Sequence, residues 1–97
     1  MRRVKLDVEW AAWRTVEPHL KDLHLMVYAY FYWAGARGAT QQDVEDYYAK
    51  GKNTSTYRSR VPELGRQSRL CRTKEKRLNS KGNLSYVWVA DKWMNNG

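Results

Sequence analysis

The sequence predicts a single, mostly α-helical domain that ends in a small β-hairpin. From residue 4 to residue 64 the apolar side chains recur at steps of three and four, which is typical of helices with one buried face. After Gln67 the period changes to two, and two short strand-like runs flank a polar stretch rich in Asn, Ser and Gly. With 97 residues, of which 42% are hydrophobic, the chain can build one compact core but not two domains.

An N-terminal helical extension is predicted over residues 4–17. Trp10 and Trp13 lie on its apolar stripe together with neighbours at helical spacing. Pro18 disfavours helix at the residue before it and suits the first position of a new helix, because its missing N–H would have no partner there. The extension is therefore expected to end at residue 17.

A second helix is expected from residue 18 to residue 34. Residues 25–34 contain no charged side chain, and a helix that is apolar on every side is buried on every side. The outer side of this helix could pack against either the N-terminal helix of the same chain or a second subunit. The second alternative would make the N-terminal helices the surface of a homodimer.

The third helix is predicted over residues 41–50. Thr40 and Asp43 stand three residues apart at its start and resemble a capping box with Asp in place of Glu. Gly51 follows its last residue and is expected to close it. Residues 18–68 would then form a three-helix core.

A fourth helix is expected to begin at Asn53 or Thr54, after a short turn over residues 51–53, and to continue to Leu64. Pro62 interrupts this pattern because a proline inside a helix removes one backbone hydrogen bond. Either the helix kinks at that point or it begins later than residue 54.

The C-terminal hairpin is predicted over residues 69–90, with strands at 69–73 and 85–90 and a charged tip at 74–83. Leu78, an apolar residue in the middle of this tip, could act as a wedge or fold back onto the domain, and folding back is expected. Residues 91–97 are expected to form a frayed tail except where Trp93 packs.

The positive charge of the chain is concentrated in one third of its length. Residues 52–82 hold ten Lys and Arg against Glu63 and Glu75, which accounts for the whole formal net charge of +8. Such asymmetry indicates a polyanionic partner, nucleic acid first and an anionic membrane surface second. The alternative is a solvated basic face without a partner.

The sequence gives little support for a catalytic site, a cofactor site or a metal site. His19 and His24 are five residues apart and do not share a helix face, so they do not form a metal pair. Cys71 is the only cysteine; it excludes an intrachain disulfide, fits a reducing compartment, and is expected to be a small core residue. The sequence has no Gly-rich phosphate loop and no nucleophile elbow. We therefore expect a protein that is not an enzyme, with no cofactor, no metal and no small-molecule ligand.

A membrane span and a signal peptide are not expected either. No apolar run approaches the roughly 18 residues that a span needs. The basic N-terminus leads into acidic residues rather than into a hydrophobic stretch. The expected location is cytoplasmic.

Four short motifs at good spacing resemble those of a known family. They are GATQQDV at Gly38–Val44, RVPEL at Arg60–Leu64, RLNSKG at Arg77–Gly82 and VWV at Val87–Val89. Residues 36–90 thereby resemble the small winged-helix DNA-binding proteins that are common in bacteriophages and prophages. Pro62 within RVPEL departs from the family pattern, and the usual Gly ahead of the first wing strand is missing.

The resemblance implies a winged helix-turn-helix with an N-terminal helical extension. It also implies double-stranded DNA as partner, with the fourth helix in the major groove and the hairpin on the backbone or in the minor groove. A sequence-preferring transcription regulator, or a recombination or replication accessory factor, would fit, in a bacterial or phage-infected cell. Two other functions remain as alternatives: a winged-helix module for protein contact, and binding of single-stranded nucleic acid by stacking of bases on exposed Tyr.

The candidate DNA-binding residues combine three chemistries. Arg pairs bidentately with guanine, hydroxyl side chains suit phosphate oxygens, and clustered cations gain from counterion release. Thr54, Ser55 and Thr56 could instead cap the fourth helix. Arg58 is expected to reach a base edge, whereas Lys76 and Arg77 should contact phosphates from a flexible tip. The full set is Lys52, Asn53, Thr54, Ser55, Thr56, Arg58, Arg60, Arg72, Lys74, Lys76, Arg77, Asn79 and Lys81.

Overall fold

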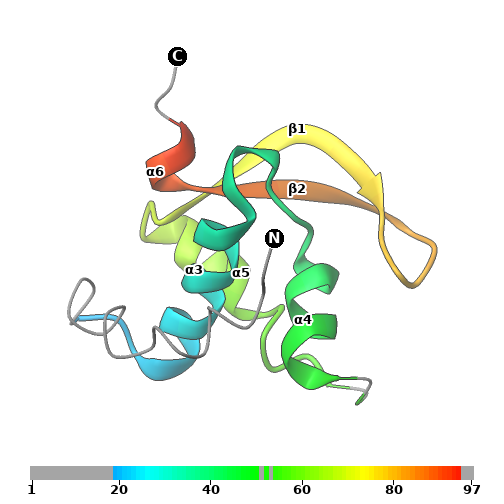
Figure 1. Ribbon diagram of the computed structural model, residues 1–97, viewed down its shortest axis with the longest axis horizontal. Helices are drawn as coiled ribbons and strands as arrows, with labels where there is room; N and C mark the ends of the chain where they lie inside the picture. Colours follow the sequence, from blue (N-terminus) through cyan, green and yellow to red (C-terminus); the bar gives the residue numbers. More distant parts are fainter. Residues whose placement is uncertain (1–18, 51, 53, 95–97) are drawn as a thin grey trace.

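The computed structural model describes residues 19–50, 52 and 54–94, and within them helices are followed by one antiparallel hairpin (Figure 1). The helices α3, α4 and α5 enclose an apolar core that the hairpin completes. This confirms the predicted order of helices and hairpin, while the predicted helix at 4–17 lies outside the described residues. The elements are α3 (Asp22–Ala34), the 3₁₀ turn η1 (Gly35–Arg37), α4 (Gln41–Ala49), α5 (Arg60–Arg66), β1 (Leu70–Leu78), β2 (Leu84–Ala90) and α6 (Asp91–Met94).

Helix α3 is the centre of the core. It begins at Asp22 rather than at residue 18, because Lys21 is extended and serves as the N-cap while Asp22 places its carboxylate in the first turn. The side chains of Leu25, Val27, Tyr28, Ala29, Tyr30 and Phe31 are at most 5% exposed. The middle of the helix is thus buried within one chain, whereas Met26, Tyr32, Trp33 and Ala34 are half-buried, and the homodimer stays a prediction.

Helix α4 begins with the predicted capping box. The Thr40 hydroxyl accepts a hydrogen bond from the Asp43 N–H, and the Asp43 carboxylate accepts one from the Thr40 N–H. Two of the four N–H groups that a helix start leaves without partners are satisfied in this way. At the other end Lys50 adopts a left-handed conformation with φ of 53°, and Gly51 lies outside the described residues.

Helix α5 begins at Arg60, which confirms the alternative that it begins later than residue 54. Hydrogen-bonded turns over residues 56–59 precede it, and most of the expected turn at 51–53 lies outside the described residues. Pro62 therefore falls in the first turn of α5, where an N–H would have no intrahelical partner. A residue with an N–H at position 62 would donate to the Arg58 carbonyl, which proline cannot do. This carbonyl accepts hydrogen bonds from the Val61 N–H at 3.2 Å and from Gln41 Nε2 at 3.0 Å instead.

The hairpin has longer strands and a shorter tip than predicted. β1 extends to Leu78, so the tip covers residues 79–83 rather than 74–83. The register shifts between Arg72 and Lys76, and the Thr73 hydroxyl donates to the Val87 carbonyl at 2.8 Å within this bulge. Figure 1 shows the hairpin projecting beyond the helices.

Three smaller expectations are corrected by the hairpin and the segment after it. Leu78 does not fold back, since it is 71% exposed, and Cys71 is half-buried rather than a core residue. The segment after β2 is not frayed at its start: it forms α6, whose Trp93 indole donates to the Tyr32 carbonyl at 2.9 Å. Residues 95–97 lie outside the described part of the chain.

A backbone bridge attaches the start of α4 to the hairpin. Ala39 and Trp88 exchange two hydrogen bonds, N–H to carbonyl at 3.0 and 2.8 Å, on the edge of β2 that β1 leaves open. Gly38 makes this approach possible, because a Cβ at its position would lie 2.5 Å from the Trp88 carbonyl oxygen. Its φ of 73° also lies in a region that favours glycine.

We predict that Gly38→Ala destabilises the fold much more than Gly35→Ala. Both glycines have φ near 74°, so both variants carry a backbone cost of about 1–3 kcal/mol. Only at Gly38 does the added methyl also overlap Trp88, Val87 and Val89, whereas nothing lies within 4 Å at Gly35. Urea unfolding followed by tryptophan fluorescence measures the difference. Equal losses for the two variants would contradict the bridge as a tight contact.

Candidate nucleic-acid interface

A buried carboxylate holds the segment that leads into α5. Glu45 of α4 is 1% exposed. Its Oε1 accepts hydrogen bonds from the backbone N–H groups of Tyr57 and Arg58 at 2.8 and 2.9 Å, and its Oε2 accepts from the Thr54 hydroxyl. A buried charge is tolerated when it is satisfied in this way. Residues 54–58 are therefore fixed on α4 before α5 begins.

The same contacts set the ionisation of Glu45. Burial by itself raises the pKa of this carboxyl group, but the hydrogen bonds from Thr54, Arg58 and Tyr57 and the charge of Arg58 outweigh it. The pKa of Glu45 is thus lowered from its ordinary value of 4.5. At neutral pH the group is a carboxylate that accepts from all three donors.

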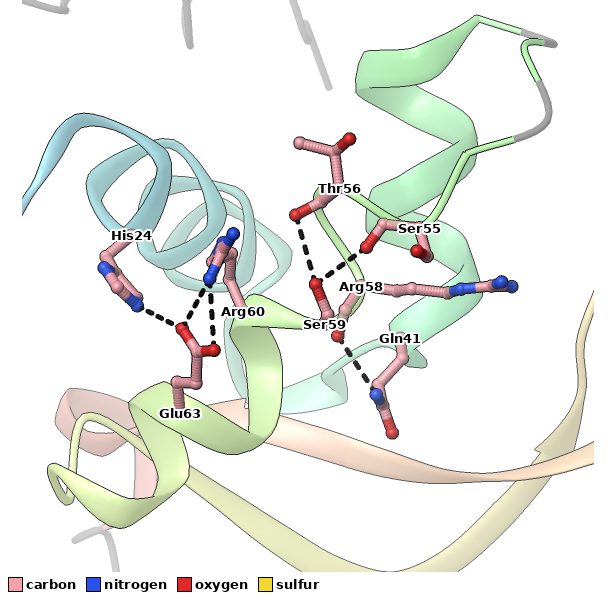
Figure 2. A network of polar contacts seen from close by, with 8 residues as sticks. All are labelled: His24, Gln41, Ser55, Thr56, Arg58, Ser59, Arg60 and Glu63. Carbon is pink, nitrogen blue, oxygen red and sulfur yellow. Dashed lines mark hydrogen bonds and ion pairs between the residues drawn. The ribbon is translucent and has the colours of Figure 1, made fainter.

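Arg58 extends away from α5 in Figure 2. Its Nη1 donates to Gln42 Oε1 at 2.9 Å, which orients the guanidinium along the start of α4. The structure gives the other guanidinium nitrogens no partner among the described residues. Arg58 therefore has donors left for a ligand, and its contact with a base edge stays a prediction.

Arg60 points in the opposite direction, toward α3 (Figure 2). Its Nη1 contacts both carboxylate oxygens of Glu63, at 2.9 and 3.1 Å, and His24 Nε2 of α3 lies 2.7 Å from Glu63 Oε1. The hydrogen bonds from Arg60 and His24 lower the pKa of Glu63. Arg60 thus connects α5 to α3 and does not share the direction of Arg58.

The hydroxyl residues ahead of α5 do not cap it. Ser59 is the N-cap and makes no side-chain capping bond; its hydroxyl donates to the Ser55 carbonyl at 2.8 Å. Thr54 is engaged by Glu45, while Ser55 and Thr56 are exposed. Lys52 is exposed as well, and Asn53 lies outside the described residues.

Two cations of the hairpin stack on one aromatic ring. The Arg72 guanidinium carbon lies 4.4 Å and Lys76 Nζ 4.8 Å from the centre of the Tyr86 ring. Because these cations already contact the ring, Tyr86 is a poor platform for base stacking. Lys74 and Lys81 are exposed on the same hairpin, with no partner in the described part of the chain.

Lys76 and Arg77 lie within β1 and not at a flexible tip, which corrects the sequence expectation. Arg77 Nε donates to Glu75 at 2.9 Å and its Nη2 donates to the Arg37 carbonyl of η1 at 2.5 Å. Removing this side chain would loosen the hairpin from the domain as well as delete a charge. Asn79, at the true tip, uses its side chain within the turn.

The predicted residues thus separate into two exposed groups and an anchoring group. Lys52, Ser55, Thr56 and the half-buried Arg58 belong to the segment before α5, whereas Arg72, Lys74, Lys76 and Lys81 belong to the hairpin. Thr54, Arg60, Arg77 and Asn79 hold the structure in shape. Sequence reasoning missed Glu45 and Gln42, the supports of Arg58. Glu45 is one of three acidic residues near the start of α4, which by themselves indicate only a favourable interaction with the helix dipole.

A hollow of about 600 Å³ lies on the opposite side of α4 from Glu45's contacts, between α3, η1 and α4. Its lining combines three aromatic residues with two acidic and two basic ones: Tyr30, Trp33, Tyr47, Asp43, Asp46, Arg37 and Arg77. The charges of this lining balance, unlike those of the exposed basic residues. Because Arg77 belongs to β1, the hollow adjoins the hairpin.

Within residues 19–50, 52 and 54–94, no helix is long and apolar enough to cross a membrane. Across the same residues, no group of three or more His, Cys, Asp or Glu side chains is arranged to hold a metal ion. No family model, curated protein or solved structure matches the chain.

We predict that Glu45→Gln lowers the free energy of unfolding at neutral pH by about 1–3 kcal/mol, because a charged acceptor of three hydrogen bonds is replaced by a neutral one. In the wild type the lowered pKa of Glu45 adds stability above its ordinary value of 4.5, and this stability is lost as the pH falls below that value. The variant lacks that part of the pH dependence.

Urea unfolding over a pH series compares the two proteins, with Glu63→Gln as the matched control. The control removes a carboxylate that is about one third exposed, so Glu45's share of the acid sensitivity should persist in it. If wild type and Glu45→Gln lose stability in parallel on acidification, the role given to Glu45 is wrong.

Proposed function

We propose that this chain is a winged-helix protein that binds double-stranded DNA. The order of the elements supports the winged-helix fold: α3, the Ala39 bridge, α4, α5 and then a basic hairpin in the place of the wing. The support in chemistry is the charge, since the surplus of eight positive charges lies between residues 52 and 82.

The observation that carries the proposal is the support of Arg58. Glu45 fixes its backbone and Gln42 orients its guanidinium, so a cation with unused donors is presented ahead of α5. An arginine held in this way can pair with guanine at small entropic cost. Neighbouring hydroxyl groups of Ser55 and Thr56 suit phosphate oxygens.

The hairpin supplies contacts that do not depend on sequence. Lys74 and Lys81 are exposed, and Arg72 and Lys76 flank Tyr86. Cations on a projecting ribbon neutralise phosphates and release counterions, so they add affinity for any duplex and make it sensitive to salt. Together the two groups would give a sequence-preferring binder, of the kind used as a transcription regulator or as a recombination or replication accessory factor of phage type.

One observation favours a second candidate, a module for protein contact. The hollow between α3, η1 and α4 combines three aromatic rings with two acidic and two basic residues, which would suit a partner segment that carries aromatic and charged side chains. In that case the basic segments would contribute little. The measurements below separate the two candidates.

We predict that Arg58→Ala weakens binding to a preferred duplex by about 1–3 kcal/mol and reduces discrimination against other duplexes. Lys74→Ala and Lys81→Ala should weaken binding to all duplexes alike, each lowering the slope of log K against log salt by about one. Fluorescence anisotropy with labelled duplexes over a salt series measures both effects, after selection of the preferred site from a random pool.

Lys21→Ala serves as the matched control, because Lys21 is an exposed lysine at the start of α3. It should leave affinity and salt slope unchanged. If the wild type binds no duplex, or if Lys21→Ala behaves like Lys74→Ala, the DNA proposal fails and protein contact becomes the better candidate.

A further inference from the structure

The free end of the hairpin carries an exposed pair of leucines. Leu78 and Leu84 are direct partners in the register of β1 and β2, and they are 71% and 66% exposed. Tyr86, two residues along β2 and on the same face, is 37% exposed. Large apolar side chains gathered at a projecting tip mark a contact surface, because their exposure to water brings no benefit to folding.

The tip is held in a fixed shape. The Asn79 N–H donates to the Asn83 carbonyl at 2.8 Å, and Asn79 Oδ1 accepts from the N–H groups of Lys81 and Asn83. Asn79 Nδ2 donates to the Ser85 hydroxyl at 2.6 Å. This network closes the two strands beside the leucines, so the pair is presented outward with little freedom to collapse.

Charge complementarity indicates what the leucines meet. Lys76 and Lys81 precede and follow Leu78 within three residues on either side, and Lys74 and Arg72 lie further along β1. An apolar pair that is flanked by cations in the sequence would suit a partner with negative charges outside and apolar groups inside. Duplex DNA has this character, because phosphates border a narrow groove whose floor leads to stacked bases.

We propose that Leu78 and Leu84 form a wedge that enters the minor groove, inserts at a base-pair step and bends the duplex. The proposal rests on the proposed DNA-binding function and adds a mode of contact to it. Apolar side chains inserted from the minor groove unstack a step and kink DNA toward the major groove. The wedge would therefore favour easily unstacked pyrimidine–purine steps, a preference that needs no contact with base edges.

The test compares bending and unstacking in one set of duplexes. Energy transfer between dyes at the two ends reports the bend, and a fluorescent adenine analogue at a central TA step reports unstacking. The variants are Leu78→Ala/Leu84→Ala and the conservative Leu78→Met, with Ser80→Ala as a control at an exposed polar position of the same tip. Because both leucines are exposed, the double variant should keep its fold, which circular dichroism verifies.

We expect the wild type to bend the duplex by about 20–90° and to raise the analogue's fluorescence. The double variant should still bind but lose at least half of both signals, while Leu78→Met and Ser80→Ala retain them. If the wild type binds without bending, or if the double variant bends DNA as the wild type does, the wedge is refuted and the DNA-binding proposal stands. If no duplex is bound at all, the function itself is refuted and the wedge with it.

Discussion

The buried carboxylate of Glu45 is the interaction on which the proposed interface depends. It belongs to α4, yet its hydrogen-bond donors are Thr54, Tyr57 and Arg58 of the following segment. Removing that segment would leave a buried charge without partners, which is costly. The stability of the fold and the position of Arg58 are therefore coupled: the contact that satisfies the carboxylate also places the arginine.

One face of the hairpin packs on the domain, and the other face is largely exposed to solvent. On one face Arg77 bonds the backbone of η1, and Val87 and Val89 pack closely over Gly38. On the other face, beyond the partly buried Trp88, the cations around Tyr86 and the leucine pair are exposed. The bulge between Arg72 and Lys76 lies between the part of the hairpin that packs and the part that projects. A ribbon anchored in this way can hold a rigid contact surface away from the core.

The sequence predicted what depends on neighbouring residues and missed what depends on distant ones. The capping box of Thr40 and Asp43 was predictable because its partners are three residues apart. For α5, Pro62 left two alternatives, a kink or a later start, because the choice between them depends on Glu45 and Gln41, which hold residues 54–58 from a different helix. The length of β1 was hidden because residues 74–77 are all charged and carry no alternating pattern; their strand state comes from pairing with β2. Of the candidate residues, Arg60 and Arg77 were chosen by charge, and the distant contacts that tie them to the fold, His24 on Glu63 and the Arg37 carbonyl, were visible only in three dimensions.

The central proposal is that the segment before α5 and the outer face of the hairpin both contact duplex DNA. Its most direct test is a titration of the isotope-labelled protein with a short duplex, followed by backbone amide NMR. The account predicts that shifts concentrate in residues 54–58 and 72–84 and leave α3 and α6 unchanged. Shifts centred on Tyr30, Trp33 and Tyr47, or no shifts at all, would contradict it.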